Sequence, residues 1–235
     1  MSRARWHLAP RTSVRLIGWL PVAGSAVAVA LLLTLNATLW RGQSAPLLPT
    51  ARVVETFVPL VVGLHAAFLL SAEDEPSLEL LLACPRPLAW ALLERVAVMA
   101  AQQGSVALGG SLVGLALPGA EVSHLAIARW LTPCAWFGGV ALFTTQLTRQ
   151  GVFGALLAML LWGGTFFGGD ALLTCWPFLW PLHAYLQPEA VAPNTYVLNR
   201  SGLILAGFIL TALAARLTRD EERMLGVRKV RGVRP

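Results

Sequence analysis

Six stretches of apolar residues, each close to the length of a membrane-crossing helix, restrict the folds open to this chain more than any other feature. A helix needs about 20 apolar residues to cross the hydrocarbon core of a bilayer. Hydrophobic residues make up 56% of the sequence and charged residues only 13%, whereas soluble domains average about 25% charged. The sequence therefore predicts an all-α membrane protein with six spans. The spans are expected at residues 22–40, 53–70, 96–117, 130–147, 152–169 and 197–217.

A seventh apolar block, residues 170–187, is short and contains Pro177 and Pro181. This pattern predicts a re-entrant or interfacial hairpin on the outer side rather than a span. Cytoplasmic loops of membrane proteins carry an excess of Lys and Arg, and six spans with both ends inside put fourteen of the eighteen basic residues on that side. The four left outside are Arg41, Arg52, Arg129 and Arg200.

Two flanking segments complete the predicted organisation. Residues 1–21 are expected on the inner membrane surface, and the basic tail 218–235 is expected in the cytoplasm. Basic residues there contribute about 1 kcal/mol each against anionic lipid headgroups. The net charge of +6 is explained by this topology. Nucleic-acid binding, which needs a basic patch on a folded face, is not expected.

Catalytic motifs are absent from the sequence. Lys229, followed by Val230, is the one lysine of the chain, so a phosphate-binding GxxxxGK[ST] loop is excluded. The four histidines form no HExxH motif, and the three cysteines form no CxxC pair. The chain is therefore not expected to be an enzyme, to hydrolyse ATP itself or to bind a metal or cofactor.

A polar loop, residues 71–95, separates the second and third predicted spans. Asp74 and Glu75 precede Pro76, which suits the first turn of a short helix, and Pro85 would end that helix. So short a helix is unstable alone in water. One side is expected to pack on the bundle or the lipid interface, and the other is available to a cytoplasmic partner. The alternative is a loop that folds back on its own bundle. At 100° per residue, the residues that share one face are Leu78, Leu81 and Leu82.

The segment EDEPSLELLLACPRPLAWALLERV, residues 73–96, resembles the loop of type-2 (ABC-2) ABC-transporter permeases. The family pattern runs acid-x-acid-G-T-L-E-x-L-L-x-[ST]-P, and here Pro76 replaces the glycine. The lysine often found near the start of the next helix is absent, and Glu94 and Arg95 occupy that neighbourhood. The matching residues are Glu73, Glu75, Ser77, Leu78, Glu79, Leu81, Leu82 and Pro85.

The segment 181–225 resembles the end of the same permeases. In the family an outer hairpin leads through an Asn-Arg pair, here Asn199-Arg200, into a last span closed by acidic and basic residues, here Glu221-Glu222-Arg223. With six spans and both ends inside, the resemblance covers nearly the whole chain.

The resemblance implies the membrane subunit of an ABC transporter, with ATP and Mg²⁺ bound by a separate ATPase subunit. Such permeases work in pairs, with a second copy or a related permease, and tend to export their substrate. The excess of Arg over Lys indicates a bacterial protein, located in the inner membrane. The loop would be the coupling helix that contacts the ATPase through Glu73, Asp74, Glu75, Ser77, Leu78, Glu79, Leu81 and Leu82.

Polar residues at membrane depth are candidates for the translocation pathway because they are costly when they face lipid. The alternative for each is an interhelical hydrogen bond, which averages about 0.6 kcal/mol. Trp176 and Trp180 of the hairpin are candidates for an outer gate, or for an aromatic belt at the interface. The pathway candidates are His65, Gln102, Gln103, Thr144, Thr145 and Gln146.

Two pairs of glycines, Gly110-x3-Gly114 and Gly164-x3-Gly168, predict close helix packing through small residues.

Other functions remain open from the residues alone. A haem-handling permease would be similar in size, although nothing in the four histidines favours it. An ATP-independent secondary transporter would be expected to show an inverted internal repeat, which the sequence lacks. A noncatalytic membrane scaffold is the third alternative.

Overall fold

The protein is described by a computed structural model at residues 23–31, 34, 50–71, 81, 87–115, 126–169, 171, 175, 181–186 and 191–220. Within these ranges the secondary structure is helical and there is no strand. The all-α class predicted from the sequence is thus confirmed. The helical segments are 23–31, α3 (Thr50–Ala67), α5 (Leu88–Leu115), α6 (Ala126–Thr148), α7 (Gly151–Phe167) and α9 (Pro193–Leu217).

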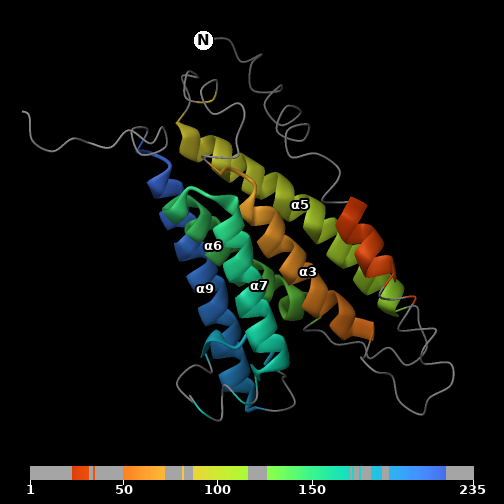
Figure 1. Cartoon of the computed structure of the whole chain (residues 1–235). Helices are drawn as coiled ribbons and strands as arrows, with labels where there is room; N and C mark the ends of the chain where they lie inside the picture. The colour runs from red at the N-terminus through yellow and green to blue at the C-terminus, as the bar shows by residue number, and fades with distance from the viewer. Residues whose placement is uncertain are drawn as a thin grey trace, which may run out of the picture.

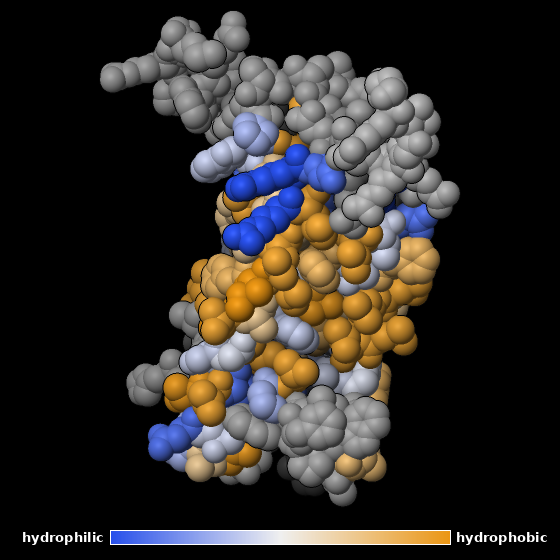
Figure 2. All heavy atoms as spheres, turned by 90° about the vertical axis from the view of Figure 1, so that its left-hand side faces the viewer, coloured by the Kyte–Doolittle hydropathy of each residue, from blue (hydrophilic) through white to orange (hydrophobic). Residues whose placement is uncertain are grey.

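Within the part of the chain that the structure describes, two helices are long and apolar enough to cross a bilayer: α5 over Leu88–Val113 and α9 over Pro193–Leu217. On the face seen in Figure 2, hydrophobic side chains predominate in the middle of the molecule, with hydrophilic side chains towards both ends. The exposed apolar side chains include Leu160 of α7 and Phe208 of α9. Exposed apolar patches this large mark an interaction surface, and they support association with a membrane.

Successive helices run in opposite directions along the bundle (Figure 1). At one end, Ser71, just after α3, contacts the turn between α6 and α7 at Gly151. At the other end, Thr56 of α3 contacts Trp162 of α7 and Tyr185. We call the end of the bundle at Ser71 the loop end, because the connection 72–86 between α3 and α5 starts there. We call the end at Thr56 and Tyr185 the hairpin end.

Helix α5 begins before the predicted third span. The span is predicted at residues 96–117, and α5 begins at Leu88, directly after Pro87. Residues 88–95 of the predicted loop 71–95 therefore form the first two turns of α5. In the second of these turns Arg95 is buried and donates a hydrogen bond to the Leu69 carbonyl.

Helix α6 lies at the centre of the bundle and packs most extensively against α9 and α3. Its contact with α9 is made by glycines. A Cβ atom added at Gly207 would collide with the carbonyl oxygen of Ala135, and one added at Gly139 would lie 2.9 Å from the Gly207 Cα. The two backbones are therefore in direct contact, which is the packing mode that small residues allow in membranes. We call this contact the glycine seam.

The two glycine pairs singled out in the sequence behave differently. A Cβ added at Gly110 would lie 3.0 Å from Val29 and 3.1 Å from Val54, so close packing there is confirmed. A Cβ added at Gly164 would have no described atom within 4 Å. Among the described residues Gly164 therefore lacks the close packing that its spacing predicts, because spacing identifies a helix face without identifying its neighbour.

Candidate functional site

The predicted ATPase-contacting segment belongs to the loop end. Leu81, half-buried, packs against the buried core of the bundle. A partner would therefore reach only the remaining part of its surface. The other predicted contact residues lie outside the described residues: Glu73, Asp74, Glu75, Ser77, Leu78, Glu79 and Leu82.

Side chains from α5 and α6 donate hydrogen bonds to carbonyl groups at the end of α3, in Ala67, and just after it, in Leu69 and Leu70. The last carbonyls of a helix have no partner within the helix, and when buried they need one from elsewhere. A cation such as Arg95 is also favoured there by the helix dipole. The bonds are Arg95 Nη1 to the Leu69 oxygen at 2.5 Å, Thr145 Oγ1 to the Ala67 oxygen at 3.0 Å, and Gln146 Nε2 to the Leu70 oxygen.

Ser71 joins the same end of α3 to the turn between α6 and α7. Its hydroxyl donates to the Arg149 carbonyl at 3.0 Å and accepts from the Gly151 N–H at 3.1 Å. Arg149 has a φ of 68°, a left-handed conformation uncommon for residues other than glycine. Together Ser71, Arg95, Thr145 and Gln146 form what we call the donor clamp.

Of the six pathway candidates, four form interhelical hydrogen bonds. His65 of α3 and Gln103 of α5 are both buried, with His65 Nδ1 and Gln103 Nε2 3.2 Å apart. Thr145 and Gln146 belong to the donor clamp. Gln102 and Thr144 are half-buried, and in the described residues neither side chain forms a hydrogen bond with His65 or Gln103.

We expect the His65–Gln103 hydrogen bond to fasten α3 to α5. A double-mutant cycle of His65→Leu and Gln103→Met should give a coupling free energy of about 0.6 kcal/mol, the average for interhelical hydrogen bonds. Unfolding of the purified chain in detergent measures it. Strictly additive effects of the two substitutions would contradict this role.

At the hairpin end, two adjacent residues of α9 hold the segment 181–186 in place. They are Asn199 and Arg200, the pair that carries the resemblance, and both are buried in the second turn of α9. Their side chains donate to four carbonyl groups. The bonds run from Arg200 to Ala184 at 2.7 Å and Leu186 at 2.8 Å, and from Asn199 to Pro181 at 3.0 Å and His183 at 3.3 Å.

The segment 181–186 also bonds to the first half of α3. The Thr56 carbonyl accepts from Tyr185 Oη at 3.2 Å and from Trp162 Nε1 at 2.9 Å. Burial raises the pKa of Tyr185 well above 10, so its hydroxyl stays protonated and able to donate. Pro59 lies one turn further along α3, where it lacks the N–H that would bond to the Glu55 carbonyl.

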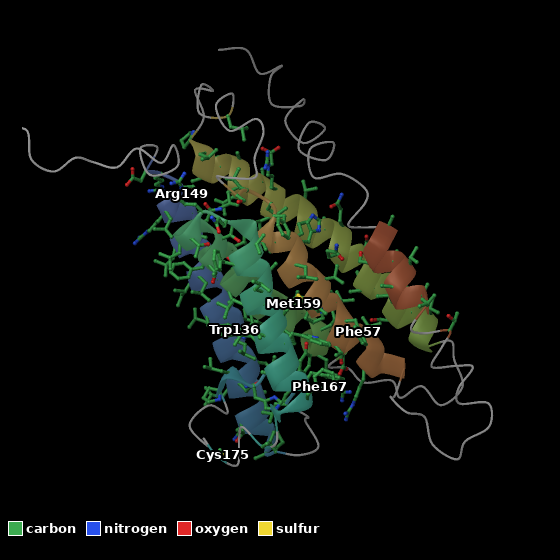
Figure 3. All side chains as sticks on the ribbon, in the orientation of Figure 1. Phe57, Trp136, Arg149, Met159, Phe167 and Cys175 are labelled. Carbon is green, nitrogen blue, oxygen red and sulfur yellow. The ribbon has the colours of Figure 1, made fainter. Side chains whose placement is uncertain are left out.

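An aromatic cluster surrounds these bonds, with ring centroids 4.8 to 6.2 Å apart. Figure 3 places Phe57 and Phe167 in this half of the bundle, with Arg149 at the opposite end. The predicted gate residues Trp176 and Trp180 lie outside the described residues. The cluster consists of Phe57, Phe137, Trp162, Phe166, Phe167 and Tyr185.

Comparison with protein-family models, curated proteins and solved structures gave no match to this chain.

Proposed function

We propose that this chain is the transmembrane permease subunit of a type-2 ABC transporter. It moves its substrate, by export, across a bacterial inner membrane, paired with a second copy or a related permease. A separate ATPase subunit binds ATP and Mg²⁺ and contacts the loop end. The observation that carries the proposal is the donor clamp. The connection 72–86 starts directly after Ser71, which is buried and bonded to the turn between α6 and α7, and it leads into α5, whose second turn is bonded to Leu69 through the buried Arg95.

The alternating helices support a six-span topology with both ends in the cytoplasm. Arg216 and Arg219, exposed at the end of α9, and Arg149 in the turn before α7 belong to the loop end. An excess of basic residues on one side is typical of the cytoplasmic face. In this topology the hairpin 170–187 is on the outer side, and the packing of 181–186 against α3 and α9 favours its re-entrant form.

The test is purification of the tagged chain from its native host in mild detergent, followed by mass spectrometry and an ATPase assay. We expect an ATPase to copurify in stoichiometric amount. Exposed ion pairs contribute only about 0 to 1 kcal/mol each, so the leucines should supply most of the binding. Replacing Leu78, Leu81 and Leu82 together with alanine should remove the ATPase from the purified chain.

The matched control is Leu160→Ala, which removes an exposed leucine from α7, away from the loop end. It should keep the ATPase. Retention of the ATPase by the folded triple variant would contradict the coupling role of the leucines. A clean wild-type preparation without ATPase would instead favour an ATP-independent transporter or a scaffold.

A further inference from the structure

Four helix ends converge at the loop end: the end of α3, the start of α5, the end of α6 and the start of α7. The side chains that join them, those of the donor clamp, are all buried. In a buried site water does not compete for these hydrogen bonds, and an unpaired partner is costly. The four ends are therefore held together more firmly than exposed contacts would hold them.

The contact between α3 and α7 is close as well as hydrogen-bonded. A Cβ atom added at Gly151, the first residue of α7, would lie 3.0 Å from the Ala67 carbonyl oxygen and 2.6 Å from the Phe68 ring. Ser71 is also bonded on both sides of the turn. The end of α3 and the first turn of α7 are therefore in close, hydrogen-bonded contact.

We propose that the donor clamp is a positioning element of the transport cycle, which makes the end of α3 and the first turn of α7 move as one body. This inference rests on the proposed function, because the displacement would come from the ATPase acting on the connection 72–86. Ser71 lies directly before that connection, Arg95 lies in the second turn of the helix that follows it, and Thr145 joins α6 to the same body. The clamp thereby carries the displacement to α7, whose exposed apolar face borders lipid or the paired permease.

The experiment uses the full chain with its copurifying ATPase in lipid nanodiscs. Hydrogen–deuterium exchange is compared between the nucleotide-free complex and the complex trapped with ADP and vanadate. In the wild type, trapping should change exchange both in residues 87–95 and in residues 150–158. Ser71→Ala and Thr145→Val should retain the ATPase and the change at 87–95, and lose the change at 150–158.

Two control variants separate positioning from general stability. Thr145→Ser keeps the hydroxyl that donates to Ala67 and should restore the response of residues 150–158. Thr148→Ala removes a hydroxyl from the same turn that bonds only to Thr144 and Gln150 in the described residues, and it should respond like the wild type.

The possible results separate the two proposals. If residues 150–158 respond normally in both Ser71→Ala and Thr145→Val, the clamp only stabilises the fold and the inference is overturned. A wild-type complex that responds at 87–95 but not at 150–158 would overturn it equally, while leaving the proposed function intact. If no ATPase copurifies with the wild type, the proposed function fails and the inference fails with it.

Discussion

Replacing Gly207 with valine is expected to destabilise the bundle by about 3 kcal/mol or more, the upper end of the range for overpacked cores. The added side chain would meet the α6 backbone at Ala135 and Trp136. Backbone atoms cannot move aside as the end of a flexible side chain can, so the whole glycine seam must separate. Unfolding of the purified chain in detergent, followed by circular dichroism, measures the effect.

Gly202→Val is the matched control, since a Cβ at Gly202 on the same helix meets no described atom within 4 Å. This variant has the same cost of placing valine in a helix, but its side chain does not collide with the backbone of α6. If the two variants unfold alike, α6 and α9 are not in backbone contact in the folded protein.

Replacing Arg200 with methionine is expected to cost about 3 kcal/mol and to release the segment 181–186. Methionine preserves most of the apolar volume but leaves the carbonyls of Ala184 and Leu186 without these donors, at about 1–3 kcal/mol for each buried unsatisfied group. The guanidinium also lies over the Tyr196 ring, 4.8 Å from its centroid, which adds a cation–π contribution. Detergent unfolding gives the free energy, and limited proteolysis near residues 181–186 reports the release.

Arg216→Met makes the same chemical change at an exposed position near the other end of α9. This variant should keep a free energy of unfolding and a protease sensitivity close to those of the wild type. Equal protease sensitivity in the two variants would show that Arg200 does not hold the segment.

The sequence predicts the all-α class of this chain but not the contacts between its helices. Apolar length indicates helices because hydropathy is a local property. The bond between Arg95 and the end of α3 could not be predicted, because the two are distant in sequence. The contact between Gly139 and Gly207 could not be predicted for the same reason, because the two residues are 68 positions apart and meet only after folding.

For the candidate site too, the sequence singles out some of the residues but does not predict their contacts. His65, Gln103, Thr145 and Gln146 could be singled out because polar residues are rare in apolar runs, but the sequence does not show that they bond to one another or to backbone carbonyls. Ser71 was missed as a clamp residue, since a hydroxyl that bonds to a distant backbone leaves no local pattern. Asn199 and Arg200 were identified through the family resemblance, and their contacts with 181–186 emerge only from the fold.

The glycine seam also has a consequence for biogenesis. Among the described helices α9 is the last in the chain, so α6 is synthesised before the helix against which it packs most extensively. Until α9 is made, the backbone of α6 at Gly139 has no such neighbour, and the residues of α9 that hold 181–186 are also missing. Closure of the bundle must therefore follow the synthesis of α9.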